Sequence, residues 1–368
     1  MRDMKHLGRF ASLILFVFPC IFPSLSAAQS EGSQQFADFG DFKLRSGGVI
    51  RDFRLGYRAL GKLDAEKSNA VLWPTWLGGK SEDLLQFVGP GKVVDTNQYF
   101  VILVDAIGNG VSSSPSNSKK QPRMNFPEFS IRDMVEAERR LVTETLHLAH
   151  LRAVVGLSMG GMQAFEWATA YPDFMDLVVA MAGSPQSTSY DKLLWTTEID
   201  AIELDPAWNH GNPTGPLTRG IALEREIESM RDTSPAYRVA QTLPGAFPAF
   251  LETVRAHAMA EGGTASDQIR QRQAILAHDI PGELGLTLEQ AAARVRAKLL
   301  VIVSPQDHTV NPEPAMKFAA VAGSPLLKLD SLCGHQSLAC ISVGPIVARF
   351  LADPSSVRSE TLVDTGNH

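Results

Sequence analysis

Short apolar runs that alternate with helical patterns organise most of the chain. These runs are rich in valine, isoleucine and leucine and have Gly, Pro or Ser close to their ends. Such runs are typical of strands that are buried on both faces of a parallel sheet. They cover residues 69–76, 99–108, 151–158, 176–184, 297–307 and 325–331. The alternation predicts an α/β fold with a mostly parallel sheet and helices on both faces.

Two further segments carry local signals. Residues 41–60 alternate between apolar and polar positions around Gly47 and Gly48, which predicts a β-hairpin. In residues 130–148, Ser130 and Asp133 have the spacing of a capping box ahead of apolar positions on one helical face. We therefore expect a helix there, and the same periodicity predicts helices over residues 159–171 and 343–352.

The strand and helix alternation stops between about residues 185 and 297. This stretch holds helical pieces joined by Pro- and Gly-rich segments and no clear strand pattern. We expect a helical cap inserted over residues 186–285, with the core formed by residues 29–185 and 286–353. The last helical piece, with Thr287 as its N-cap, is expected in the helix layer of the sheet. Residues 354–368 are predicted to form a polar, frayed tail.

The first 28 residues have the three parts of a secretory signal peptide. Arg2, Lys5 and Arg9 precede an apolar run over residues 10–22, and small residues follow up to Ala28. The run is shorter than the roughly 20 residues that a membrane-spanning helix needs. We expect cleavage after Ala28 and a periplasmic or secreted protein without stable membrane insertion, and an uncleaved anchor is the alternative.

Composition narrows the classes of partner and cofactor. Lys and Arg total 34 against 40 Asp and Glu, and no basic run occurs, which argues against nucleic-acid binding. The three cysteines have no metal-ligand spacing, so we expect no metal site. Cleavage of the signal peptide would leave Cys333 and Cys340, which form a disulfide or remain two packed thiols.

A candidate nucleophile lies between a predicted strand and a predicted helix. The residues from Gly156 to Gly160 read G-L-S-M-G, the pattern of a nucleophile elbow, with Ser158 at its centre. Small residues on either side permit the tight turn that exposes the serine, and the N–H of Met159 at the helix N-terminus is a predicted oxyanion donor. A glycine-rich turn with a helix-capping serine is the alternative.

A serine nucleophile needs a base and a carboxylate that orients the base. In this class of fold the acid and the histidine follow the serine in that order. Asp307 lies at the end of the apolar run over residues 297–307, just past the predicted strand, and His335 lies in the loop after the next strand. We predict that Ser158, Asp307 and His335 form a catalytic triad. The alternatives are a helix-capping or surface Asp307, a packed loop His335, and His308 as the base.

A second oxyanion donor is expected from the loop after the strand at residues 69–76. Leu77 N–H is the predicted donor, and the neighbouring Trp76 is a candidate for the substrate pocket. An ordinary turn that covers the core is the alternative.

Several long segments resemble the homoserine O-acetyltransferase family. They are GLSMGGMQAFEWA (156–168), VGPGKVVDTNQYFVI (88–102), FPEFSIRDMVEAERRLV (126–142) and AIELDPAWNHGNP (201–213). The resemblance implies an α/β-hydrolase fold with a helical cap, a covalent acyl-serine intermediate that is passed to an acceptor, and a homodimer formed through the cap.

Three departures from that family concern the acceptor. An acidic residue that helps to hold the amino group of homoserine follows the family's catalytic histidine, whereas Gln336 stands here. The family has a loop with a His-Ala-Leu-Thr pattern, which here reads PTWLGG, with Thr75 in place of the histidine. The cap arginine for the substrate carboxylate has no clear counterpart, since Arg255, Arg270 and Arg272 do not follow the family's pattern. The sequence therefore does not keep the pattern of two charged contacts that would select an amino acid in that family.

These observations favour a secreted esterase that hydrolyses a small-molecule carboxylic ester through an acyl-enzyme, without metal or cofactor. The alternative is an O-acyltransferase similar to the resembling family, with acetyl-CoA as the donor. A non-catalytic binding protein on the same fold is a second alternative.

Overall fold

The computed structural model describes residues 32–260 and 265–365, and within them the fold is built around a nine-stranded sheet. The signal peptide expected over residues 1–28 lies outside the described residues. The strands are β1 (Gln35–Lys43), β2 (Val49–Leu60), β3 (Ala70–Pro74), β4 (Phe100–Val104), β5 (Leu151–Leu157), β6 (Met175–Met181), β7 (Lys298–Val303), β8 (Leu326–Asp330) and β9 (Glu360–Val363).

The strand order is β1-β2-β4-β3-β5-β6-β7-β8-β9. β1 pairs antiparallel with β2, which confirms the predicted hairpin, and β2 pairs antiparallel with β4. All the pairs from β4 to β9 are parallel. The mostly parallel sheet confirms the predicted fold class, and it brings the carboxyl ends of β3, β5, β7 and β8 to one edge, where ligands bind in open α/β sheets.

Twelve α-helices accompany this sheet within the described residues. They are α1 (Ile131–Arg140), α2 (Met159–Ala170), α3 (Ser189–Glu203), α4 (Thr218–Arg231), α5 (Pro235–Gln241), α6 (Phe247–Ala260), α7 (Ala265–Leu276), α8 (Ile280–Leu284), α9 (Leu288–Ala292), α10 (Glu313–Val321), α11 (Ser337–Cys340) and α12 (Gly344–Ala352).

The strands carry a separate apolar core on each face. Side chains that alternate along β3 to β7 pack on one face with α1, α2, α9 and α10. The remaining side chains of these strands pack on the other face with α12 and with residues 84–94. Burial on both faces explains why the central strands read as continuous apolar runs in the sequence.

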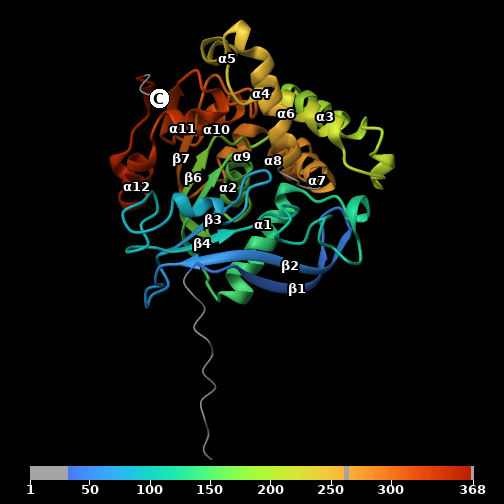
Figure 1. The fold of residues 1–368 in the computed structure, drawn as a ribbon. Coiled ribbons are helices and arrows are strands. Elements are labelled where there is room, and N and C mark those ends of the chain that lie inside the picture. The colour runs from blue at the N-terminus through green and yellow to red at the C-terminus, as the bar shows by residue number, and fades with distance from the viewer. Residues whose placement is uncertain (1–31, 261–264, 366–368) are drawn as a thin grey trace, which may run out of the picture. The chain divides into compact units, whose positions relative to one another are not determined.

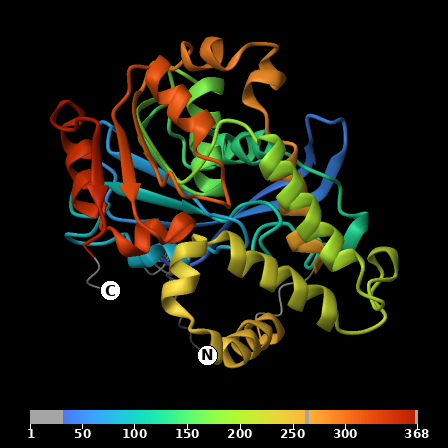
Figure 2. The same ribbon diagram turned by 90° about the horizontal axis from the view of Figure 1, so that it is seen from above.

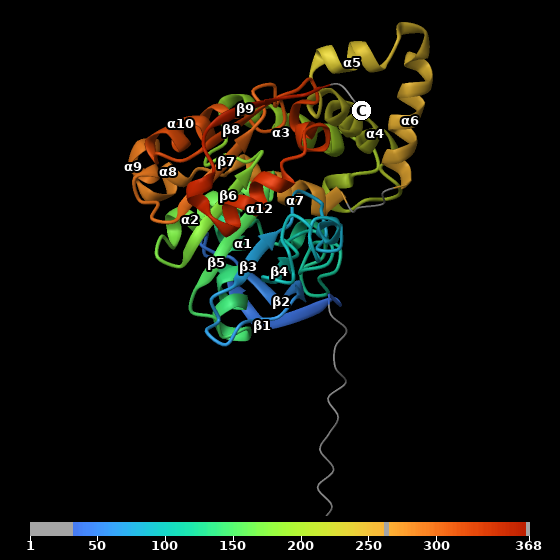
Figure 3. The same ribbon diagram turned by 90° about the vertical axis from the view of Figure 1, so that its left-hand side faces the viewer.

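Helices α3 to α6 lie together outside the sheet layers, as Figures 1, 2 and 3 show. They belong to the segment for which a helical cap was expected. Helix α7 packs against α3 and also contacts the loop at residues 123–125, which belongs to the core. This helix therefore joins the cap to the loops at the edge of the sheet.

Local capping signals were good predictors of helix starts. Ser130 accepts a hydrogen bond from the backbone N–H of Asp133, whose carboxylate accepts in return from the N–H of Ser130, so the predicted capping box is confirmed. Thr287 caps α9 in the same way through Gln290. The helix that was predicted over residues 130–148 is α-helical only as far as Arg140. Residues 141–145 form a π-helical turn after it.

The prediction of a frayed tail over residues 354–368 is wrong for part of that segment. Residues 360–363 form β9, which pairs in parallel with β8. Half-buried Leu362 packs on the core face that α12 covers. Ser331 also donates a hydrogen bond to the carboxylate of Asp364. The strand is short and mostly exposed, so its sequence has neither a long apolar run nor a clear alternation.

Among the described residues, no helix combines the length and the apolar character that crossing a membrane requires.

Candidate active site

Ser158 stands in a strained turn between β5 and α2. Its backbone φ is 57°, a conformation that side-chain-bearing residues rarely adopt. The two flanking glycines make the turn sterically feasible. A Cβ on Gly156 would lie 1.9 Å from the carbonyl oxygen of Gly160, and one on Gly160 would lie 2.6 Å from that of Pro74. The G-x-S-x-G pattern therefore has the steric origin that the sequence suggested.

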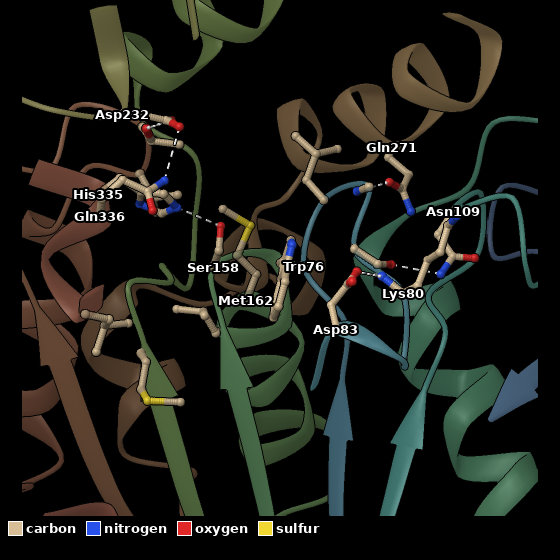
Figure 4. Close-up of a pocket in the computed structure, with 18 of the residues that line it drawn as sticks. Trp76, Lys80, Asp83, Asn109, Ser158, Met162, Asp232, Gln271, His335 and Gln336 are labelled. Atoms are coloured by element: carbon tan, nitrogen blue, oxygen red, sulfur yellow. Dashed lines mark hydrogen bonds between the residues drawn. The ribbon is translucent and has the colours of Figure 1, made fainter. Parts of the chain in front are cut away.

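The structure brings Ser158, His335 and Asp307 into one hydrogen-bonded chain (Figure 4 shows the first two). His335 Nε2 is 3.0 Å from Ser158 Oγ, and His335 Nδ1 is 2.7 Å from Asp307 Oδ2. The other carboxylate oxygen of Asp307 accepts from the backbone N–H of Thr309 and Val310. Asp307 is therefore fixed on both oxygens, and it can hold the imidazole in the tautomer that accepts a proton from the serine.

Opposing effects set the pKa of His335. Burial lowers the pKa, but the charge and hydrogen bond of Asp307 and the nearby charge of Asp232 raise it, and their sum leaves the pKa above the ordinary histidine value. Arg231 opposes this rise as a smaller effect. The stability that comes from protonated His335 is present at low pH and is lost as pH rises through this raised pKa.

The two backbone N–H groups that were predicted as oxyanion donors have no acceptor of their own within the described part of the chain, and Leu77 lines the same cavity as Ser158. Among the described residues, neither Met159 N nor Leu77 N meets a hydrogen-bond acceptor. Met159 is the first residue of α2, so the helix dipole adds a positive potential at this point. Both predicted donors therefore have an unused N–H in the structure.

A cavity of about 1240 Å³ opens above Ser158 and His335. One part of its wall is apolar, and half-buried Trp76 stands beside Ser158 there (Figure 4). The other part is formed by charged side chains of the cap, which the sequence reading did not assign to the site. The apolar lining includes Trp73, Trp76, Phe87, Val93, Leu157, Met181, Leu338 and Val343.

Buried ion pairs hold the cap helices at the cavity. Glu198 of α3 accepts from Arg231 of α4 at one carboxylate oxygen and from Arg272 of α7 at the other, at 2.5 and 2.7 Å. Arg272 also pairs with Glu224 of α4. Both guanidinium groups line the cavity, but their charges are already matched by carboxylates. Nothing in the local sequence pattern marks these pairs, since they join three separate helices.

The region around Gln336 differs from what the sequence alone indicated. Gln336 lines the cavity, and its side-chain amide donates to the carboxylate of Asp232, at 3.1 Å. Asp232 also accepts from Arg231, at 2.6 Å, and from the hydroxyl of Thr309. A carboxylate thus stands beside the neutral residue at position 336, although it comes from the end of α4.

The three cap arginines that the sequence offered lie in different places. Arg272 reaches the cavity, whereas Arg270 donates to the carbonyl of Met124 and pairs with Glu128. Arg255 pairs with Glu226 at the surface.

Cys333 and Cys340 form a disulfide, with their Cα atoms 6.6 Å apart. Of the two alternatives that the sequence left open, the structure has the bridge. It closes the short segment that contains His335 and Gln336. His308, the competing histidine, contacts the ring of Tyr190 instead.

Comparisons with known proteins agree with this architecture. Residues 77–338 match the family model described as the alpha/beta hydrolase fold. The ethyl acetate hydrolase of Pseudomonas veronii is 34% identical over 57% of this chain and 61% of its own length. A homoserine O-acetyltransferase of Leptospira biflexa is 30% identical over 82% of this chain and 88% of its length. The chain spans 55% to 61% of the first curated relatives that it matches.

Among solved structures, that of the acetyl esterase MekB superimposes with a TM-score of 0.81 and 27% identity. The superposition covers 88% of this chain and 98% of that one. The likeness therefore extends over the core and the cap together.

Proposed function

The chain belongs to the alpha/beta hydrolase fold family, within the group that contains the homoserine O-acetyltransferases, and we propose that it is an esterase that cleaves a carboxylic ester through an acyl-serine intermediate. The observation that carries the proposal is the hydrogen-bonded chain from Asp307 through His335 to Ser158, in a cavity that Leu77 with its unused N–H also lines. The named activities of the ethyl acetate hydrolase and the acetyl esterase support it.

In the proposed reaction, Ser158 Oγ attacks the ester carbonyl while His335 Nε2 takes the serine proton. Asp307 orients the imidazole through Nδ1 and stabilises its charged form. The N–H groups of Met159 and Leu77 donate to the oxyanion of the tetrahedral intermediate. His335 then gives the proton to the leaving alcohol as the ester C–O bond breaks. In the second half a water attacks the acyl-serine and gives its proton to His335. The acyl–Oγ bond then breaks, His335 returns the proton to Ser158 Oγ, and the carboxylic acid leaves. These steps use only the chain and water, so the proposal needs no metal and no cofactor.

Transfer of an acetyl group to an alcohol is the second candidate, with acetyl-CoA as the donor. The observation that favours it is the carboxylate of Asp232 beside Gln336, because an anion at this place can attract the amino group of an acceptor. This second reaction would use the same serine, histidine and aspartate, and it would differ only in the group that attacks the acyl-enzyme.

The fate of the acyl group separates the two candidates. The mature protein is incubated with a chromogenic acetyl ester and excess homoserine, and NMR resolves the products, with Ser158→Ala as the control. We expect acetate as the main product, with its formation lost in the variant. O-acetylhomoserine as the main product would overturn the esterase proposal in favour of the acetyltransferase. Unchanged turnover in Ser158→Ala would overturn both.

We propose further that the protein acts in a periplasm or outside the cell. The disulfide supports this location, because disulfides persist in oxidising compartments. Sequencing the N-terminus of the exported protein tests cleavage after Ala28.

A homodimer remains part of the proposal. Large apolar side chains that are exposed on the cap support it, because an interface would bury them; they include Met230, Val239, Leu243 and Phe247. Light scattering of the mature protein tests the state, and a monomer at micromolar concentration would contradict it.

A further inference from the structure

A glutamine of the cap helix α7 binds the loop that carries a proposed oxyanion donor. We call residues 76–79 the oxyanion loop. The side-chain oxygen of Gln271 accepts from the backbone N–H of Gly78, at 2.8 Å (Figure 4), and its amide nitrogen donates to the carbonyl of Ile107, at 2.9 Å. One side chain thus joins the loop after β3 to the loop after β4.

The donor peptide itself has a fixed direction. The carbonyl of Trp76 accepts from the N–H of Gly79, at 3.0 Å, and this carbonyl belongs to the same peptide group as Leu77 N–H. In a trans peptide the C=O and N–H point in opposite directions, so this turn aims the N–H of Leu77 away from Gly79. Gln271 fixes the next peptide group along the chain, which limits the rotation of the whole loop.

The side chain of Gln271 is buried at the junction of the two loops. The residue is 1% exposed, and both polar atoms of its side chain are satisfied. Removing the side chain would leave the buried carbonyl of Ile107 without its partner, which is costly, and would release the N–H of the exposed Gly78. On the same helix, Arg270 docks α7 to the core through the carbonyl of Met124 and through Glu128, without contact to the oxyanion loop.

We propose that Gln271 is a positioning residue that aligns Leu77 N–H with the oxyanion from the cap side. This inference rests on the proposed function, because it takes Leu77 as a donor during acyl transfer. Its neighbour Arg272 pairs with Glu198 of α3 and Glu224 of α4. A shift of these cap helices would therefore act on the oxyanion loop through adjacent residues of α7.

The test compares variants of α7 in the mature protein. Gln271→Ala removes both bonds, Gln271→Glu keeps an acceptor for Gly78 and loses the donor to Ile107, and Arg270→Ala weakens the docking of α7 alone. For each we measure kcat and KM with an acetyl ester, and the inhibition constant of a trifluoromethyl ketone. This ketone forms a tetrahedral adduct with the serine and needs the same oxyanion donors.

We expect Gln271→Ala to lower kcat by about tenfold or more and to raise the inhibition constant of the ketone by the same factor. KM should stay within about twofold of the wild-type value, because only the transition state uses the donor. Gln271→Glu should lie between wild type and the alanine variant. Arg270→Ala should lose thermal stability and keep kcat within about twofold.

Equal losses of kcat in Arg270→Ala and Gln271→Ala would overturn the inference in favour of general docking, and so would unchanged ketone binding in Gln271→Ala. If the alanine variant does not fold, Gln271→Glu decides by the same two readouts. The Ser158→Ala variant tests the proposed function independently of the role of Gln271. An inactive Ser158→Ala beside a fully active Gln271→Ala refutes the positioning role alone.

Discussion

Glu138 on α1 is buried against α2, and its charge state should control how the stability of the protein depends on pH. One carboxyl oxygen accepts from the indole N–H of Trp167, at 2.6 Å, and the other has no partner among the described residues. Burial raises the pKa of Glu138 from 4.5 to about 8, and the hydrogen bond from Trp167 lowers it by less. The folded protein therefore holds this carboxyl in its neutral form at pH 7.

The expected penalty follows from the two pKa values. Below pH 4.5 the carboxyl is protonated in both states, so its protonation costs nothing. As pH rises, the unfolded chain loses the proton first, and the free energy of unfolding falls by about 1.4 kcal/mol per pH unit until about pH 8. At pH 7 the accumulated loss is about 3 kcal/mol.

Glu138→Gln should remove this loss, because an amide does not titrate and its oxygen can still accept from Trp167. In the variant, the amide NH₂ stands where the second carboxyl oxygen of Glu138 stands in the wild type. That position has no hydrogen-bond partner among the described residues, so the substitution neither adds nor removes a bond at this position. We expect the variant to be more stable than wild type at pH 7 by about 3 kcal/mol, with an advantage that grows from pH 5 to pH 8. Urea unfolding at half-unit pH steps measures the difference.

Glu144→Gln is the matched control on the same segment. Glu144 is half-exposed and pairs with Arg140, which lowers the pKa of Glu144. Its substitution should give a small difference in stability that stays flat between pH 5 and pH 8. A flat difference for Glu138→Gln, or a loss of stability at pH 8, would refute the reasoning.

Three further predictions concern the site. Asp232→Asn should move the acid limb of the kcat/KM profile to lower pH, because loss of this charge lowers the pKa of His335, and an unmoved limb contradicts the cause given for the shift. Replacing Cys340 by Ser should lower the free energy of unfolding by about 2 kcal/mol, and dithiothreitol should destabilise the wild type by a similar amount but not the variant, because both changes remove the same bridge; urea unfolding with and without dithiothreitol measures this. Trp76→Ala should raise the kcat/KM ratio of butyrate to acetate esters about tenfold, and an unchanged ratio would place the acyl chain elsewhere.

The sequence predicted those parts of the fold that local rules determine. The central strands were visible because burial on both faces demands continuous apolar runs, and Ser130 and Thr287 marked helix starts because their side chains satisfy free N–H groups. The chain order of Ser158, Asp307 and His335 pointed to loops after β5, β7 and β8. The structure places all three residues there and joins them by hydrogen bonds.

The remaining features depend on contacts between distant segments. Gln271 lies 193 positions from Gly78, and Glu198 joins α4 and α7 from a third helix. No periodicity or spacing encodes such a pair, because each partner is an ordinary residue of its own helix. The carboxylate of Asp232 near position 336 was missed for the same reason, and so was β9, whose pairing with β8 defines it more than its sequence does.

The position of β9 also has a consequence for how the protein behaves outside its native state. β9 covers the backbone N–H and C=O groups of β8, which would otherwise form an open sheet edge with apolar Leu327 and Leu329 behind it. An uncovered edge of this kind is a template for pairing with another chain. A version shortened before residue 354 should therefore aggregate during refolding even where its active-site geometry is retained, and the yield of soluble monomer would show how strongly the segment after α12 protects the sheet.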